Sequence, residues 1–186
     1  MKVALISDTH VPPTPELPGQ LLDHLARVDL ILHAGDLVCL HVLESLEEIG
    51  ETLAVHGNSD EPAVVERLPR KRLLSVAGRS VGLIHGNQAS EIEREYLKPD
   101  HDYESPPVEA FYRYLLEEFP AADVVVFGHF HVPVVMQKHG RLLINPGSVA
   151  AHNGRSSLVI LEIECSGEKA EIVELSSSPA CSDIRE

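Results

Sequence analysis

The 186-residue sequence contains no tryptophan, and aromatic side chains account for only 4% of it, which excludes a core built on large rings. Hydrophobic residues make up 44% of the chain, a share that fits one globular domain with an ordinary core. Leucine, valine, isoleucine and alanine must therefore fill that core. We expect a single domain over residues 1–175 and a flexible, serine-containing tail over residues 176–186.

Cysteine and long apolar runs are equally scarce. Cys39, Cys165 and Cys181 lie far apart and form no Cys-x-x-Cys pair, so a reduced compartment is a simpler interpretation than a disulfide framework. No apolar run is long enough to span a bilayer, and the apolar start at residues 2–6 is too short for a secretory signal. These absences predict a cytoplasmic protein without a membrane partner.

Basic residues are few: 15 Lys and Arg stand against 29 Asp and Glu, which gives a net charge of −14 with His neutral. Such a surface repels nucleic-acid backbones at long range, which argues against a nucleic-acid scaffold role. Attack on the end of a nucleic acid would need local help from cations, and bound metal ions could supply it.

The chain does contain short apolar runs separated by helical patterns. In the first half, residues 3–6, 30–32 and 53–55 predict buried strands, and the stretches ending near residue 27 and spanning 38–48 predict helices. This alternation indicates an α/β fold with a parallel sheet. In the second half we expect a helix at 106–119, a strand at 124–127 and a hairpin of 72–76 with 80–84. Further strands, of antiparallel type, are expected at 132–137, 142–144, 158–163 and 170–173.

Residues that bind metals follow five of the predicted strands. In chain order they are Asp8 and His10, then Asp36, then Asn58, then His85, and finally His129 with His131. Ligands bind outside the carboxyl ends of strands in an open α/β sheet, so the five loops can converge on one place. The one-residue spacing within Asp8-x-His10 and His129-x-His131 predicts that each pair points to the same side of an extended segment. Carboxylates, imidazoles and one amide suit first-row divalent ions.

The ordered motifs resemble the calcineurin-like metallophosphoesterase superfamily. They are Asp8-x-His10, Gly35-Asp36, Gly57-Asn58, His85-Gly86 and Gly128-His129-x-His131. Within it, the chain is similar to the compact bacterial and archaeal phosphodiesterases related to the retromer subunit. Two further motifs support this: Gly57-Asn58-Ser59-Asp60 resembles that family's Gly-Asn-Cys-Asp, and Asn145-Pro146-Gly147-Ser148 matches its Asn-Pro-Gly-Ser. The similarity runs from Met1 to about residue 163.

The resemblance implies a four-layer α/β/β/α sandwich of the metallo-dependent phosphatase type. It also implies two divalent ions, most often Mn²⁺, with Fe, Ni, Co or Zn as substitutes. One ion would be bound by Asp8, His10, Asp36 and His131, and the other by Asp36, Asn58, His85 and His129, so that Asp36 bridges the two. The implied activity is hydrolysis of a small phosphate ester by in-line attack of a hydroxide that bridges the ions, with Asn58 and His85 at the reacting group.

The sequence departs from the family in three places. Many members have His after Gly-Asn to protonate the leaving group, but Ser59-Asp60 stands here, which makes Asp60 the candidate acid. The segment after Ser148 lacks the usual Pro-Arg. His152 and Arg155 are therefore the candidates, together with Asn58, for binding the substrate phosphate. The stretch between Gly86 and Gly128 is longer than in compact members, and residues 87–107 could form a flap over the cleft or an inert surface excursion.

Three polar residues beside the motifs are expected to act structurally. His33 and His56 precede two of the ligand motifs, and Asn145 is expected to order the loops through its side-chain hydrogen bonds.

A phosphodiesterase is the leading functional hypothesis. The alternatives are a phosphomonoesterase of the same fold and a non-catalytic, protein-binding scaffold like the retromer relative, which has lost a ligand. All seven ligand positions hold a metal-binding residue, which favours the enzyme. A metal-storage or metal-sensing role is not supported, because the sequence has no His-rich or Cys-rich tract. The substrate, the metal used in the cell and the oligomeric state stay open, a homo-oligomer included.

Overall fold

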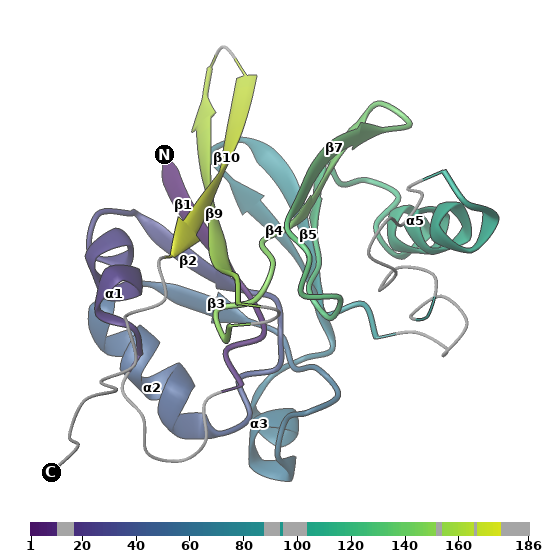
Figure 1. The fold of residues 1–186 in the computed structure, drawn as a ribbon. Coiled ribbons are helices and arrows are strands. Elements are labelled where there is room, and N and C mark those ends of the chain that lie inside the picture. Colours follow the sequence, from purple (N-terminus) through teal and green to yellow (C-terminus); the bar gives the residue numbers. More distant parts are fainter. Residues whose placement is uncertain (11–16, 88–93, 95–103, 152–153, 166, 176–186) are drawn as a thin grey trace, which may run out of the picture.

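A computed structural model describes residues 1–10, 17–87, 94, 104–151, 154–165 and 167–175. Two five-stranded sheets face each other, and helices cover their outer faces (Figure 1). The first sheet has the order β10-β9-β1-β2-β3, formed by β1 (Lys2–Ile6), β2 (Leu30–His33), β3 (Thr52–Ala54), β9 (Ser156–Glu164) and β10 (Gly167–Leu175). The second has the order β4-β5-β6-β8-β7, formed by β4 (Lys71–Val76), β5 (Arg79–Ile84), β6 (Val124–Val126), β7 (Val134–Lys138) and β8 (Arg141–Asn145). The four-layer sandwich is confirmed.

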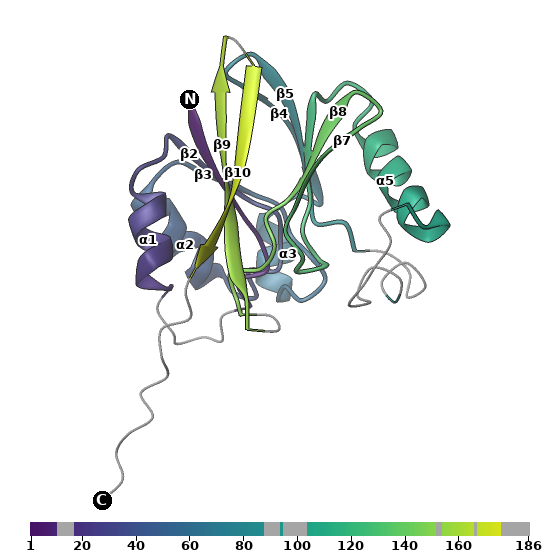
Figure 2. The same cartoon turned by 45° about the horizontal axis from the view of Figure 1, so that its top comes forward.

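Four described helices complete the layers: α1 (Gly19–Leu25), α2 (Leu40–Ile49), α3 (Pro62–Arg67) and α5 (Pro106–Glu118). Helices α1 and α2 lie against the first sheet and α5 lies against the second (Figure 2). None of the helices in the described parts of the chain is long and apolar enough to cross a bilayer.

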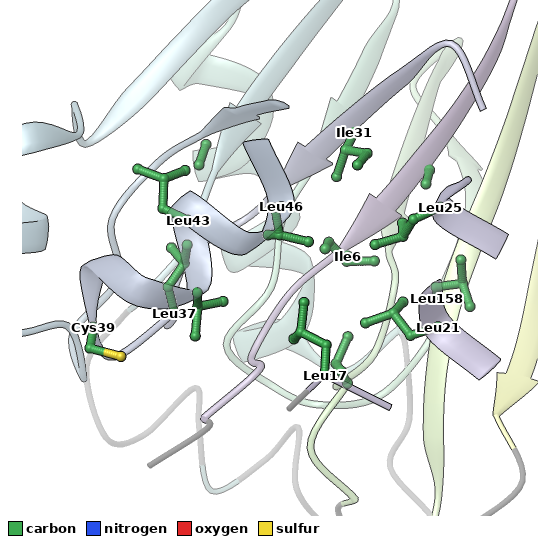
Figure 3. Close-up of a cluster of buried hydrophobic side chains, with 14 of the residues drawn as sticks. Ile6, Leu17, Leu21, Leu25, Ile31, Leu37, Cys39, Leu43, Leu46 and Leu158 are labelled. Atoms are coloured by element: carbon green, nitrogen blue, oxygen red, sulfur yellow. The ribbon is translucent and has the colours of Figure 1, made fainter. Parts of the chain in front are cut away.

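Both faces of the central strands are covered, which explains why their sequences are continuous apolar runs. Along β1, Ala4 and Ile6 face α1 and α2, whereas Val3 and Leu5 face the space between the two sheets. Figure 3 shows Ile6 and Ile31 packed against the leucines of α1 and α2. All four phenylalanines of the chain belong to a third cluster, under α5. The phenylalanine rings therefore stabilise the layer between α5 and the second sheet, and aliphatic side chains fill the other two clusters.

The strand directions bring the ligand loops to one end of the sandwich. Strand β1 is parallel to β2, and β2 is parallel to β3. Strand β6 is parallel to both β5 and β8 in the other sheet. The carboxyl ends within each parallel group therefore lie at the same edge. The expected antiparallel arrangement is confirmed for β9, β10 and the β7–β8 pair, but it was wrong for β8 beside β6.

Two local differences from the sequence prediction have physical causes. The second helix begins at Leu40 rather than residue 38, because Val38 has φ +77°, which no right-handed helix accommodates. Helix α3 was missed because its six residues are too few for a helical period, with Val64 its single buried residue.

Candidate metal centre

The five ligand loops are joined by hydrogen bonds at the carboxyl ends of β1, β2, β3, β5 and β6. The main chain of Asp8 donates to the carbonyl of Gly35 at 3.0 Å, which joins the first two loops. The main chain of Gly128 donates to the carbonyl of His85 at 3.0 Å, and the N–H of His129 donates to Asp8 Oδ2, also at 3.0 Å. The two sheets are therefore connected at this end, and the predicted ligands are brought together.

The first group of ligand atoms comprises Asp8, His10 and His131. His131 Nε2 lies 3.1 Å from Asp8 Oδ1, and His10 Nε2 lies 3.6 Å from the same oxygen. The two imidazole nitrogens are 3.1 Å apart. One ligand atom from each residue lies within 4.8 Å of the other two, so a single cation can contact all three.

The second group is centred on Asp36 and His85. His85 Nε2 lies 3.4 Å from Asp36 Oδ2 and 3.1 Å from Asn58 Oδ1. Asp8, Asp36 and His85 again offer atoms within 4.8 Å of one another. The His129 ring stands 5.1 Å from the His85 ring, centroid to centroid, at 72°. This arrangement brings Asn58 and His129 beside the same group.

One oxygen of Asp36 is close to both groups. Asp36 Oδ2 lies 3.4 Å from His85 Nε2 and 3.7 Å from His10 Nε2. The other oxygen, Oδ1, accepts the main-chain N–H of Ser59 at 2.8 Å. That bond orients the carboxylate so that Oδ2 faces the space between the imidazoles.

Asp8 is oriented in the same way. Its Oδ2 accepts the hydroxyl of Ser7 at 2.6 Å as well as the His129 N–H, which leaves Oδ1 toward the imidazoles. Ser7 is fully buried, and a Cβ added to Gly128 would lie 1.9 Å from its Oγ. Gly128 is thus required for close approach. Sequence reasoning missed Ser7, although a serine between a buried strand and a ligand carboxylate was a usable signal.

The charges of the two groups stabilise each other. Burial alone would raise the pKa of Asp8, but hydrogen bonds from His10 and His131 outweigh it and hold the pKa far below its usual range. Burial also opposes ionisation of Asp36, and His85 lowers its pKa to about 2. In return, the hydrogen bond to Asp8 raises the pKa of His10. Protons and metal ions therefore compete for the same imidazole nitrogens.

The ligand loops are not extended, which corrects the expectation for the Asp-x-His and His-x-His pairs. Five candidate ligands have left-handed backbone, with φ of +52° at Asp8, +41° at His10, +58° at Asp36, +71° at His129 and +57° at His131. Non-glycine residues in this region cost about 1–3 kcal/mol each and persist only where neighbours hold them. Such strain clusters at functional sites, and here the hydrogen bonds between loops maintain it.

The family model of the calcineurin-like phosphoesterase superfamily domain matches residues 1–166 of the chain, which include all of the candidate ligands.

The chain belongs to the calcineurin-like phosphoesterase superfamily.

Individual relatives agree with this assignment. A probable metallophosphoesterase of Methanothermobacter thermautotrophicus is 35% identical over 188 residues, which cover 99% of this chain and 98% of that protein. A phosphodiesterase of Methanocaldococcus jannaschii is 28% identical over 167 residues, covering 88% and 94%. The crystal structure of Vps29 complexed with zinc from Entamoeba histolytica has a TM-score of 0.65 at 24% identity over 94% of this chain and 99% of that one, a likeness of fold. The resemblance expected from the motifs is confirmed.

This superfamily is metal-dependent, and the donor set of this phosphoesterase fits divalent cations. Two ionised carboxylates, whose outer oxygens are held by Ser7 and Ser59, direct their remaining oxygens toward imidazole nitrogens. Mixed oxygen and nitrogen ligands at these separations suit Mn²⁺, Fe²⁺, Co²⁺, Ni²⁺ or Zn²⁺. A carboxylate or imidazole that binds a metal is oriented by a hydrogen bond to its other oxygen or nitrogen. The buried hydrogen bonds to these second atoms are therefore part of the site.

The Asn-Pro-Gly-Ser motif supports the centre from the end of β8. Asn145 Nδ2 donates to the carbonyl of Gly128 at 2.9 Å, and its Oδ1 accepts the N–H of Gly147, also at 2.9 Å. Ser148 Oγ lies 2.8 Å from the carbonyl oxygen of Asp8. The predicted loop-ordering role of Asn145 is therefore confirmed, since its amide holds the His129 loop to the end of β8.

The remaining predicted residues occupy different places. Both oxygens of Asp60 accept main-chain N–H groups of the ligand loops, which favours a positioning role over that of the proposed acid. Arg155 is exposed directly before β9, so its contact with substrate stays a prediction. His152 lies outside the described residues, as do most of residues 87–107 and the tail at 176–186.

His33 lies behind the centre and is neutral. It is fully buried, its Nδ1 accepts the N–H of Gly35 at 3.1 Å, and its Nε2 lies 3.4 Å from Thr9 Oγ1. Burial lowers the pKa of His33 from 6.5 to about 3. A ring that accepts a buried main-chain N–H is a structural element, as the sequence predicted.

We expect replacement of His33 by Asn to flatten the acid dependence of stability. The folded state resists protonating His33 until about pH 3, whereas the unfolded chain takes the proton near pH 6.5. The stabilisation is thus fully present above pH 6.5 and is lost progressively down to about pH 3. In chelator-treated protein, the slope of unfolding free energy against pH in this window should fall by up to one proton, about 1.4 kcal/mol per pH unit. Equal slopes in urea titrations of both proteins would contradict a neutral buried ring.

Proposed function

We propose that this protein is a phosphodiesterase that works with two divalent metal ions, most readily Mn²⁺. The observation that carries the proposal is the position of Asp36 Oδ2, 3.4 Å from His85 Nε2 and 3.7 Å from His10 Nε2. A carboxylate oxygen shared by two ligand groups is what a pair of closely spaced ions requires. Two divalent ions held by these residues would supply Lewis-acid activation of water and positive charge for in-line attack on phosphorus.

The roles of the chain's own residues follow from the two groups. Asp8, His10, Asp36 and His131 would hold one ion, and Asp36, Asn58, His85 and His129 the other. Asn58 is exposed and its Oδ1 is turned toward His85, while its Nδ2 donates one hydrogen to Ser59 Oγ at 3.4 Å, so we propose that the second amide hydrogen contacts a substrate phosphate oxygen. His152 and Arg155 are proposed as further phosphate contacts.

The presence of a metal-binding residue at every ligand position favours an enzyme over a non-catalytic scaffold. Vps29 shares the fold at 24% identity, which carries no activity to this chain. Here all seven candidate ligand residues lie on converging loops, and their two carboxylates are buried, oriented and charged, which supports the enzyme. Burying two carboxylates in a protein–protein scaffold would be costly without a cation to pair with them.

We expect phosphodiesters to be hydrolysed faster than phosphomonoesters. A monoester dianion needs extra cationic groups, usually Arg in bidentate geometry, and no Arg or Lys lies within the five ligand motifs. The metals would supply most of the positive charge, which suits a singly charged diester. The relative named as a phosphodiesterase supports this direction.

The measurement is kcat/KM for matched aryl monoesters and diesters at saturating Mn²⁺, with an expected preference of about tenfold or more, equivalent to about 1.4 kcal/mol. Arg155→Ala serves as a companion variant. A clear preference for the monoester that disappears in Arg155→Ala would overturn diester specificity and identify Arg155 as a phosphate clamp.

A further inference from the structure

Asp60 is bonded to the main chain of two ligand loops at once. Its Oδ2 accepts the N–H of Gly57 at 2.7 Å and that of Asp36 at 3.2 Å. Its Oδ1 accepts the N–H of Val38 at 2.6 Å. The carboxylate thus ties the loop after β2, which contains the shared ligand, to the loop after β3, which contains Asn58. Charge-assisted hydrogen bonds of this kind are stronger than neutral ones.

The loop that Asp60 holds is strained. Asp36 has φ +58° and Val38 has φ +77°, and a β-branched residue in the left-handed region is a true outlier. Two of the three N–H groups that donate to Asp60 belong to these strained residues, Asp36 and Val38. The next residue adds to the hold, since the N–H of Glu61 donates to the carbonyl of Val38 at 3.0 Å. Without these bonds, residues 36–38 would lower their conformational energy by relaxing to negative φ.

Relaxation of that segment would turn the shared carboxylate. The Ser59 N–H bonds Oδ1 of Asp36 and leaves Oδ2 toward the imidazoles of His85 and His10. Ser59 stands between Asn58 and Asp60 in the same turn. The Gly-Asn-Ser-Asp turn therefore holds Asp36 twice, by its main chain through Asp60 and by its side chain through Ser59.

We infer that Asp60 is a positioning residue that fixes the left-handed Asp36–Val38 segment and so aims Asp36 Oδ2 at the position between the two metal sites. The inference rests on the proposed two-metal function. It differs from a general-acid role, because both oxygens of Asp60 are committed to three main-chain N–H groups of the loops.

The test begins with Asp60→Asn, which keeps the shape but turns an NH₂ group toward at least one of the N–H donors. We expect Mn²⁺ affinity to fall about 10- to 100-fold, the usual range for residues that orient metal ligands. Calorimetric titration gives the affinity and stoichiometry. Electron paramagnetic resonance gives a second readout, because two Mn²⁺ ions that share a carboxylate are exchange-coupled, and we expect this coupled signal to weaken in the variant.

Asp123→Asn is the matched control. Asp123 Oδ2 also accepts a main-chain N–H, that of Ser80 at 2.8 Å, but Asp123 precedes β6 and lies at the opposite end of the sandwich. A general loss of stability would affect both variants alike. We expect Asp123→Asn to retain the wild-type metal affinity, coupled signal and kcat.

Leaving-group dependence separates positioning from acid catalysis. If Asp60 positions Asp36, kcat at saturating Mn²⁺ should fall by a similar factor for aryl diesters with good and poor leaving groups, with KM little changed. If Asp60 donates a proton, the loss should grow with the pKa of the leaving group, and metal affinity should stay at the wild-type value. The second pattern would overturn the inference.

A second-site variant keeps the inference testable if Asp60→Asn folds poorly. Glycine adopts φ +77° without strain, so Val38→Gly in the Asp60→Asn background should recover part of the metal affinity or the fold. Failure of Val38→Gly to recover either would count against the inference. Wild-type protein that binds fewer than two ions would instead refute the proposed function itself, which distinguishes the two failures.

Discussion

Replacement of Asp36 by Asn is expected to abolish hydrolysis while the protein stays folded. One oxygen of Asp36 lies against imidazoles of both ligand groups, so in the proposed two-metal centre its loss would remove the group shared by the ions. Metal ions contribute several kcal/mol to such reactions, which corresponds to a fall in kcat of roughly 10³-fold or more. Asp36 belongs to none of the three hydrophobic clusters, and the core is therefore left intact.

The measurement is kcat after chelation and return of Mn²⁺, with circular dichroism to show that the fold is retained. Asp29→Asn is a suitable control, because Asp29 Oδ2 accepts the N–H of Lys2 at 2.7 Å at the start of β2, away from the centre. We expect this control to keep full activity. Substantial turnover by remetallated Asp36→Asn would contradict the bridging assignment.

Chelation of the protein is expected to stop hydrolysis, and Mn²⁺ should restore it with two ions bound per chain. Each site filled at about 100 times its Kd stabilises the folded state by about 2.7 kcal/mol, which raises the unfolding midpoint by roughly 5–10 °C for a chain of this size. Affinity should weaken on acidification, because the carboxylates raise the pKa of His10 and His85 and protons then occupy the ligand nitrogens.

Elemental analysis and calorimetry with and without Mn²⁺ test this expectation. A fully loaded sample with one ion per chain, or two ions without exchange coupling, would refute the shared centre. A midpoint of unfolding that does not respond to Mn²⁺ would show that the buried carboxylates are satisfied by the imidazoles alone.

The positions of the ligands were predictable because each follows a strand that is easy to recognise. Runs such as Val3-Ala4-Leu5-Ile6 are continuous since both faces of β1 are covered, and the polar residue after such a run marks the strand's end. Parallel strands place these ends at one edge, so five motifs in order were enough to predict a common site.

The backbone of the site was not predictable from the sequence. The motif spacing predicted extended pairs, whereas Asp8, His10 and Asp36 have left-handed φ. That conformation is unfavourable for each residue alone and exists only because long-range hydrogen bonds, such as His129 N–H to Asp8 Oδ2, maintain it. The sequence placed His85 after a strand, and only the structure shows that its ring is buried, with Gly35 and Gly57 in close approach.

By itself, the sequence determined the α/β class, the strand ends and the residue types that gather there, since these depend on hydrophobic patterning along short stretches. Only the tertiary structure decided which oxygen of each carboxylate faces the imidazoles and which side chains, Ser7 and Asp60, hold the ligand loops. These orientations depend on hydrogen bonds between loops that are far apart in the sequence. Such bonds produce no hydrophobic periodicity, so the sequence does not predict them.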